Sequence, residues 1–160
     1  MHHLAQYNIA RARAPLGDPL LGDFVAAIAR LNEAAERAPG FVWRLKDESG
    51  ASSAYVRAYD DPRMLVNLSV WESVDALRAY TYAAPHIELF RRRAEWFEPH
   101  AGPSLVLWWI EAGHKPTVEE ADARLRHLAV HGPTEYAFNF RSADAPHSAG
   151  GAGAGISGPR

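Results

Sequence analysis

The chain has 160 residues, of which 48% are hydrophobic, and it carries a formal net charge of −2 at neutral pH with no cysteine. That length allows one domain with a substantial buried core and leaves no room for a second. The near-neutral charge excludes the positive field on which nucleic-acid binding depends. Without cysteine, disulfides, thiolate catalysis and cysteine-ligated metals are excluded, so a metal would need His, Asp, Glu or Tyr as ligands.

The N-terminal stretch MHHLAQYNIARARAP lacks the basic start and apolar run of a secretory signal. No segment reaches the ~18 consecutive apolar residues that a membrane span requires. We therefore expect a cytoplasmic protein that binds a small-molecule substrate and contacts neither membranes nor nucleic acid.

The first half of the chain predicts one helix between strands. Residues 4–9 alternate as a short strand does, and residues 19–38 follow a helical apolar pattern that ends at Ala38-Pro39-Gly40. Residues 41–45 and 54–59 are each predicted to be strands, joined as a hairpin across a polar turn.

The clearest strand signal follows, at residues 64–71, because apolar residues fill alternate positions there. Ser73 is a natural N-cap for a helix over residues 74–82. Pro85 can open a second helix, since its missing N–H costs nothing in a first turn, and this helix is predicted to continue to about Phe97.

The remaining elements lie between residues 104 and 141. Residues 104–110, SLVLWWI, are apolar on both faces, which predicts a central strand covered on both sides. Thr117 caps a helix over residues 118–131, with Glu120 at the capping-box position. Residues 135–140 are predicted to form a last strand. We expect residues 1–141 to form the domain and the Gly/Ala-rich residues 142–160 to form a flexible tail.

This order of elements predicts an α+β fold with a ferredoxin-like antiparallel sheet and helices on one face. The uncovered face of such a sheet needs a partner. Pairing two sheets across a two-fold axis would supply one, so we expect a homodimer.

The predicted helix after Pro85 carries the strongest functional candidates. On a helical wheel His86 shares one side with Leu89, Phe90, Arg93 and Phe97. His86 could ligate a metal or transfer protons near neutral pH, and Arg93 could bind a carboxylate. The alternative for His86 is a half-buried structural residue whose ring nitrogens pair with backbone or a carboxylate.

Other polar residues have two possible roles. We expect Arg91 and Arg92 to form a solvated face paired with Glu88 and Glu95. Three polar residues lie on otherwise apolar strands, where they either line a substrate-binding cavity or face solvent on the outer sheet: Asn8, Asn67 and Ser69.

Several motifs in this order resemble a bacterial family known as domain of unknown function 3291. They are FVWRL, LVNLSVWESVDALRAY, HIELFRRRAEWF, LVLWWIEAGHKPTVEEADARLRHL and HGPTEYAFNF, within residues 4–141. The resemblance implies the dimeric α/β-barrel superfamily. That superfamily includes cofactor-free monooxygenases, haem-dependent enzymes and isomerases.

The stretch SVWESVDALRAYTYAAPHIELFRRRAEWF is also similar to part of the spheroidene monooxygenase family, whose members are associated with haem. That resemblance implies His86 as an axial haem ligand. Arg93 or Arg78 would then pair with a propionate. The pocket walls would be Trp71, Tyr82, Phe90 and Trp96.

Three functions stay open from the sequence. The first is a haem-binding monooxygenase-like enzyme acting on a small apolar or aromatic substrate. The second is a cofactor-free monooxygenase or isomerase that uses His86 as general base. The third is a non-catalytic module that binds a small molecule. Fold alone does not choose among them, because function depends on the site.

Overall fold

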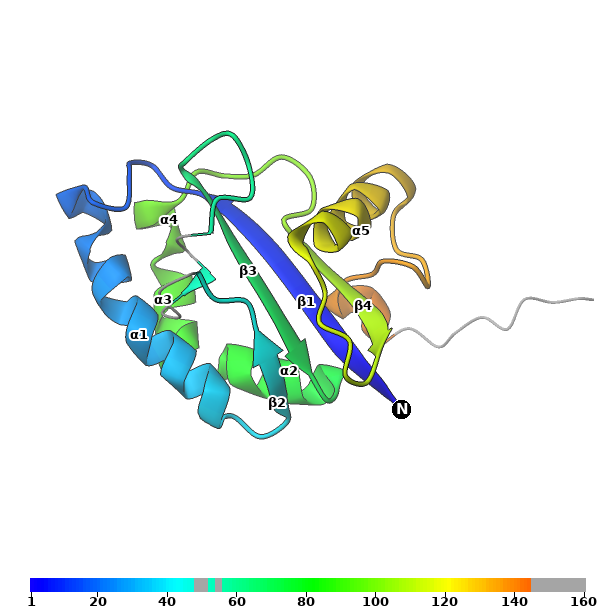
Figure 1. Cartoon of the computed structure of the whole chain (residues 1–160). Helices are drawn as coiled ribbons and strands as arrows, with labels where there is room; N and C mark the ends of the chain where they lie inside the picture. Colours follow the sequence, from blue (N-terminus) through cyan, green and yellow to red (C-terminus); the bar gives the residue numbers. More distant parts are fainter. Residues whose placement is uncertain (48–51, 54–55, 145–160) are drawn as a thin grey trace, which may run out of the picture.

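One antiparallel sheet organises the chain, in a computed structural model that describes residues 1–47, 52–53 and 56–144. Its strand order is β2-β3-β1-β4 (Figure 1). The strands are β1 (His2–Arg11), β2 (Phe41–Arg44), β3 (Met64–Trp71) and β4 (Leu105–Glu111). This order, with a helix after β1 and another after β3, confirms the predicted ferredoxin-like α+β fold.

Six α-helices of the described chain connect and cover the strands. They are α1 (Gly22–Arg37), entered through the 3₁₀ turn η1 (Pro19–Leu21), α2 (Val74–Tyr82), α3 (His86–Arg91), α4 (Arg93–Trp96), α5 (Val118–His131) and α6 (Phe140–Ala143). The predicted caps of α2 and α5 are confirmed, because the Ser73 and Thr117 side chains each accept a backbone N–H from the first turn. None of these helices is long and apolar enough to cross a membrane.

Alternation along β1 gives the sheet two different faces. Ala5, Tyr7 and Ile9 point to the face that carries α5, where they pack with Leu125 and Leu128. Residues Leu45, Val56, Ala58 and Tyr59 complete the cover of this face. As a result Ala5, Tyr7, Val106 and Trp108 have no exposed surface.

The face that we expected a second copy to cover is therefore covered within one chain. A homodimer stays a prediction, but pairing of this face with a partner's sheet is not needed to bury it. The opposite face carries α1 and α2, which pack through Ala35 and Leu77 against Leu4 and Trp71 (Figure 1).

Two predictions about strand pairing were wrong. β2 pairs with β3, whereas a hairpin with residues 54–59 was expected. Residues 54 and 55 lie outside the described residues, and residues 56–58 form no strand. β4 is an edge strand rather than a central one. Its sequence is apolar on both sides because α5 covers one face and the Phe138 and Phe140 side chains pack with Leu107 on the other. Backbone hydrogen bonds of 2.8 and 2.9 Å between Leu107 and Phe138 also pair part of its outer edge.

Two predicted elements in the C-terminal half of the chain also differ from those in the structure. The helix expected from Pro85 to Phe97 is broken at Arg92, where φ and ψ of −92° and 2° end α3 and begin α4. Residues 135–140 contribute one isolated bridge instead of a strand, and the chain then turns into α6. The expected domain boundary at residue 141 lies inside α6, while residues 145–160 lie outside the described residues, so the tail stays a prediction.

Candidate functional site

A cavity of about 810 Å³ lies between the sheet and the helices α1, α3 and α4. This volume is within the range of small-molecule sites. The sheet contributes Asn8, Ala10, Leu65 and Asn67 as the floor. The walls come from two sides: Phe24, Ile28 and Leu31 of α1, and His86, Leu89, Phe90, Arg93 and Trp96 of α3 and α4.

His86 is the ionisable side chain at the start of this wall. Its Nδ1 lies 3.0 Å from the carbonyl oxygen of Thr81. A carbonyl only accepts, so Nδ1 carries the proton and Nε2 keeps its lone pair. Nε2 makes no hydrogen bond with any described residue. Burial lowers the pKa of the imidazole below its ordinary value of 6.5, and the bond to Thr81 offsets part of that shift.

The His86 ring rests on an aromatic stack. Tyr80, which also lines the cavity, lies 5.2 Å from His86 and 5.1 Å from Trp71 between ring centroids. The Tyr80 hydroxyl donates to the Leu31 carbonyl at 3.1 Å, and burial raises the pKa of this phenol to about 12. Tyr80 is therefore a neutral support for the imidazole and not a base.

A buried hydrogen-bond chain leads from Trp71 to the cavity floor. The Trp71 indole Nε1 donates to Ser69 Oγ at 2.9 Å, and Ser69 Oγ donates to Gln6 Oε1 at 2.8 Å. Gln6 Nε2 in turn donates to Asn8 Oδ1 at 2.6 Å.

The direction of these hydrogen bonds follows from Trp71, because its indole N–H can only donate. Each later group must then accept on one side and donate on the other. With its oxygen occupied by Gln6, the Asn8 amide is left with its N–H groups to offer to the cavity. Of the three polar residues expected either to line a cavity or to face solvent, Asn8 and Asn67 lie at the cavity floor and Ser69 is buried behind it. Their contact with a substrate stays a prediction.

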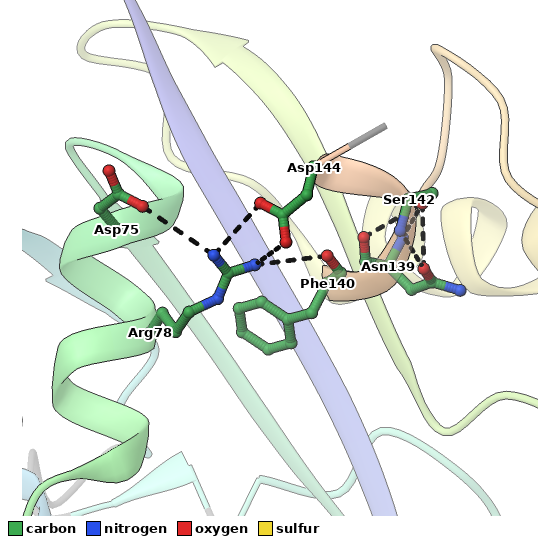
Figure 2. A network of polar contacts seen from close by, with 6 residues as sticks. All are labelled: Asp75, Arg78, Asn139, Phe140, Ser142 and Asp144. Atoms are coloured by element: carbon green, nitrogen blue, oxygen red, sulfur yellow. Dashed lines mark hydrogen bonds and ion pairs between the residues drawn. The ribbon is translucent and has the colours of Figure 1, made fainter. Parts of the chain in front are cut away.

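The predicted cationic residues occupy different surroundings. Arg93 lines the cavity, but it is exposed instead of buried in the stripe. Its guanidinium lies 4.1 Å from the Phe90 ring centroid and donates to the Phe90 carbonyl at 2.9 Å. Arg78 lies away from the cavity, between α2 and α6 (Figure 2). There it pairs with Asp144 at 2.9 Å and donates to the Phe140 carbonyl at 3.4 Å.

The residues expected to surround a haem are not gathered around His86. Phe90 and Trp96 do line the cavity. Trp71 is only 1% exposed and lies behind Tyr80, whereas Tyr82 is 68% exposed. Because Arg78 is occupied by Asp144, it does not offer a propionate contact at the cavity. The side chains present therefore do not fit the predicted haem pocket, although His86 keeps the ring nitrogen that an axial ligand requires.

Several cavity residues escaped the sequence reasoning. Phe24, Ile28 and Leu31 were identified only as the apolar side of a helix, because a cavity wall and a packed core have the same helical periodicity. Arg13 and Tyr80 gave no signal, since each reaches the cavity through the way separate elements pack together.

The chain thus combines a ferredoxin-like α+β domain with a cavity of about 810 Å³ on one side of its sheet. It belongs to the family described as Domain of unknown function (DUF3291), whose model matches residues 3–151. This membership confirms the resemblance seen in the sequence. No curated protein sequence matches the chain.

Solved structures with a similar fold include three bacterial proteins. A variant of SnoaB, a cofactor-independent oxygenase from Streptomyces nogalater, has 16% identity and a TM-score of 0.47, with 71% of this chain and 95% of that chain covered. A Nitrosomonas europaea protein provisionally named an antibiotic biosynthesis monooxygenase has 17% identity, a TM-score of 0.48 and coverages of 71% and 94%. Another Nitrosomonas europaea protein, of unknown function, has 18% identity, a TM-score of 0.47 and coverages of 73% and 97%. Similarity at this level carries no inference about chemistry.

Proposed function

We propose that this protein is a cofactor-free enzyme in which neutral His86 acts as general base on an apolar or aromatic small molecule. The observation that carries the proposal is the Nδ1 contact of 3.0 Å with the Thr81 carbonyl. Because this contact holds the proton on Nδ1, Nε2 is the basic nitrogen of the ring. His86 itself lines a cavity of about 810 Å³. The lowered pKa keeps this nitrogen unprotonated at neutral pH.

In this mechanism Nε2 takes a proton from an acidic C–H next to a carbonyl, or from a phenolic O–H. The electron pair of the broken bond remains on the substrate as an enolate or phenolate. The Thr81 carbonyl stabilises the imidazolium that forms, because it accepts a hydrogen bond from Nδ1–H. The Asn8 amide can donate to the developing oxyanion. Return of the proton at another atom gives an isomerase, and reaction of the carbanion with dioxygen gives an oxygenase.

Proton exchange tests the proposed base directly. A panel of aromatic 1,3-dicarbonyl compounds in heavy water would be followed by NMR with the wild type, His86→Gln and the control His127→Gln. His127 lies on α5, away from the cavity. We expect catalysed exchange in wild type and control, with a loss of at least ~10²-fold in His86→Gln. Equal exchange with all three proteins would contradict the proposal.

Haem binding is the competing function, because the same Nε2 suits an axial ligand. A titration with haem, read in the visible spectrum, separates the two. We expect no saturable band that depends on His86. A Soret band that saturates at one haem per chain and is lost in His86→Ala would replace the cofactor-free proposal.

A further inference from the structure

Three arginines line the cavity without an ion-pair partner among the described residues. They are Arg13, Arg91 and Arg93. Arg13 donates from Nε to the Ala94 carbonyl at 2.9 Å, and Arg93 donates to the Phe90 carbonyl. Arg91 makes no hydrogen bond or ion pair with any residue that the structure describes. A guanidinium has five N–H donors, so all three keep donors free for a ligand.

The cavity has little negative charge to balance these groups. Within residues 1–47, 52–53 and 56–144, Glu98 is the carboxylate that lines it. Glu98 is already bound by Arg11 at 2.7 Å, with Arg63 at 3.9 Å. The hydrogen bond from Arg11 holds the pKa of Glu98 below its usual range. Glu98 is therefore ionised and forms its ion pairs with Arg11 and Arg63, although its charge also interacts with Arg13. Three arginines outnumber this single carboxylate, which leaves the cavity cationic.

The neighbouring Arg92 shows the contrast. Its guanidinium binds Asp23 at 2.9 Å and Glu95 at 2.8 Å, and lies 4.7 Å from the Trp96 ring centroid. This arginine therefore ties α4 to α1 and does not line the cavity. Of the three consecutive arginines, the middle one forms ion pairs between helices, and the outer two have no ion-pair partner in the part of the chain that the structure describes.

The helix break explains how both outer arginines reach one cavity. In a continuous α-helix, residues two positions apart project roughly 200° from each other. Arg91 ends α3 and Arg93 begins α4, with non-helical torsions at Arg92 between them. The change of direction brings both side chains to the same opening.

We infer that the substrate of this cavity carries a carboxylate, which the three arginines bind, on an apolar or aromatic body. This inference rests on the proposed function, since it names the substrate class of the same site. Planar guanidinium groups match carboxylates in geometry as well as charge. Leu89, Phe90 and Trp96 supply the apolar contact. Within α3, a helical rise of about 1.5 Å per residue puts His86 and Arg91 roughly 7 Å apart along the helix axis, so the acid group lies away from the reacting atom.

A pair of ligands of nearly equal shape tests the inference. The probes are 2-naphthoic acid and its neutral amide, 2-naphthamide, with binding measured by calorimetry. The proteins are the wild type, the double variant Arg91→Gln/Arg93→Gln, the matched control Arg92→Gln and His86→Ala. The changed arginines are exposed, and circular dichroism verifies that each variant is folded.

We expect the wild type to prefer the acid over the amide by roughly tenfold or more, as charge-assisted hydrogen bonds allow. The double variant should lose this preference, whereas Arg92→Gln and His86→Ala should keep it. Equal binding of acid and amide by the wild type, or no binding of the acid, overturns the inference. So does a preference that survives in the double variant. Because His86→Ala must retain the preference, failure of the proposed base does not alter this result.

Discussion

Ser69 offers the sharpest test of the buried chain beneath the cavity. It is 7% exposed, accepts the Trp71 indole N–H and donates to Gln6. Ser69→Ala leaves one buried donor and one buried acceptor without partners. Each unsatisfied group costs about 1–3 kcal/mol, so we expect the free energy of unfolding to fall by about 2–6 kcal/mol. For a chain of this size the melting temperature would fall by roughly 4–24 °C.

Urea unfolding followed by far-UV circular dichroism measures this loss. Ser104→Ala is the matched control, because Ser104 lines the cavity and no hydrogen bond of its hydroxyl is seen within the described chain. Its effect should stay within about 0.5 kcal/mol. Combining Ser69→Ala with Trp71→Phe should shrink the Ser69 effect, since the orphaned donor is gone. If Ser69→Ala alone lowers the free energy of unfolding by less than about 1 kcal/mol, the buried hydrogen bonds of Ser69 do not stabilise the fold as argued.

Two other changes follow from the geometry. Gly40 has φ of 83°, and an added Cβ would lie 2.5 Å from the Ala76 Cβ. Gly40→Ala should therefore destabilise the fold by about 2–4 kcal/mol, whereas Gly102→Ala, with similar φ but open space, should cost about 1 kcal/mol in thermal melts. Burial places the folded pKa of His86 below 6.5, so the unfolded chain takes up this proton first as the pH falls. Stability from this residue is thus full above pH 6.5 and declines as the pH falls towards the folded pKa. The free energy of unfolding, measured against pH for the wild type and His86→Phe, should change with a different slope in the two proteins across that pH window. Parallel plots would contradict the burial of His86.

The fold could be predicted from the sequence because its signals are local. Alternation marked the strand at 64–71, and Ser73 and Thr117 marked two helix starts, all of which the structure confirms. Strand pairing is not local. The polar turn after residue 45 suggested a hairpin, but β3 provides the edge that β2 joins. β4 appeared central because α5 buries one face and Phe138 packs on the other, which gives an edge strand the composition of an inner one.

The site could be predicted only where one helix carried it. The wheel drawn from His86 placed Leu89, Phe90 and Arg93 together, and all line the cavity. It failed at Arg91, because a wheel assumes an unbroken helix and α3 ends there. Ser69 and Asn67 share one face of β3, but depth separates them, since one is buried and the other is exposed at the cavity. The alternative role of His86, a structural residue paired with backbone, holds for Nδ1, which contacts the Thr81 carbonyl. Nε2 has no hydrogen-bond partner among the described residues.

The position of α5 over the second face of the sheet bears on how the protein behaves on dilution. A chain that completes its own core does not need association in order to fold, so it should still unfold cooperatively at concentrations too low for two copies to pair. Tyr7, Tyr59 and Asp122 reinforce this closure, through hydrogen bonds of 2.8 Å that link β1 to the segment before β3 and to α5. Any second copy would then bind a finished domain through its outer surface. Each chain would carry a whole cavity of its own, at nanomolar as at millimolar concentration.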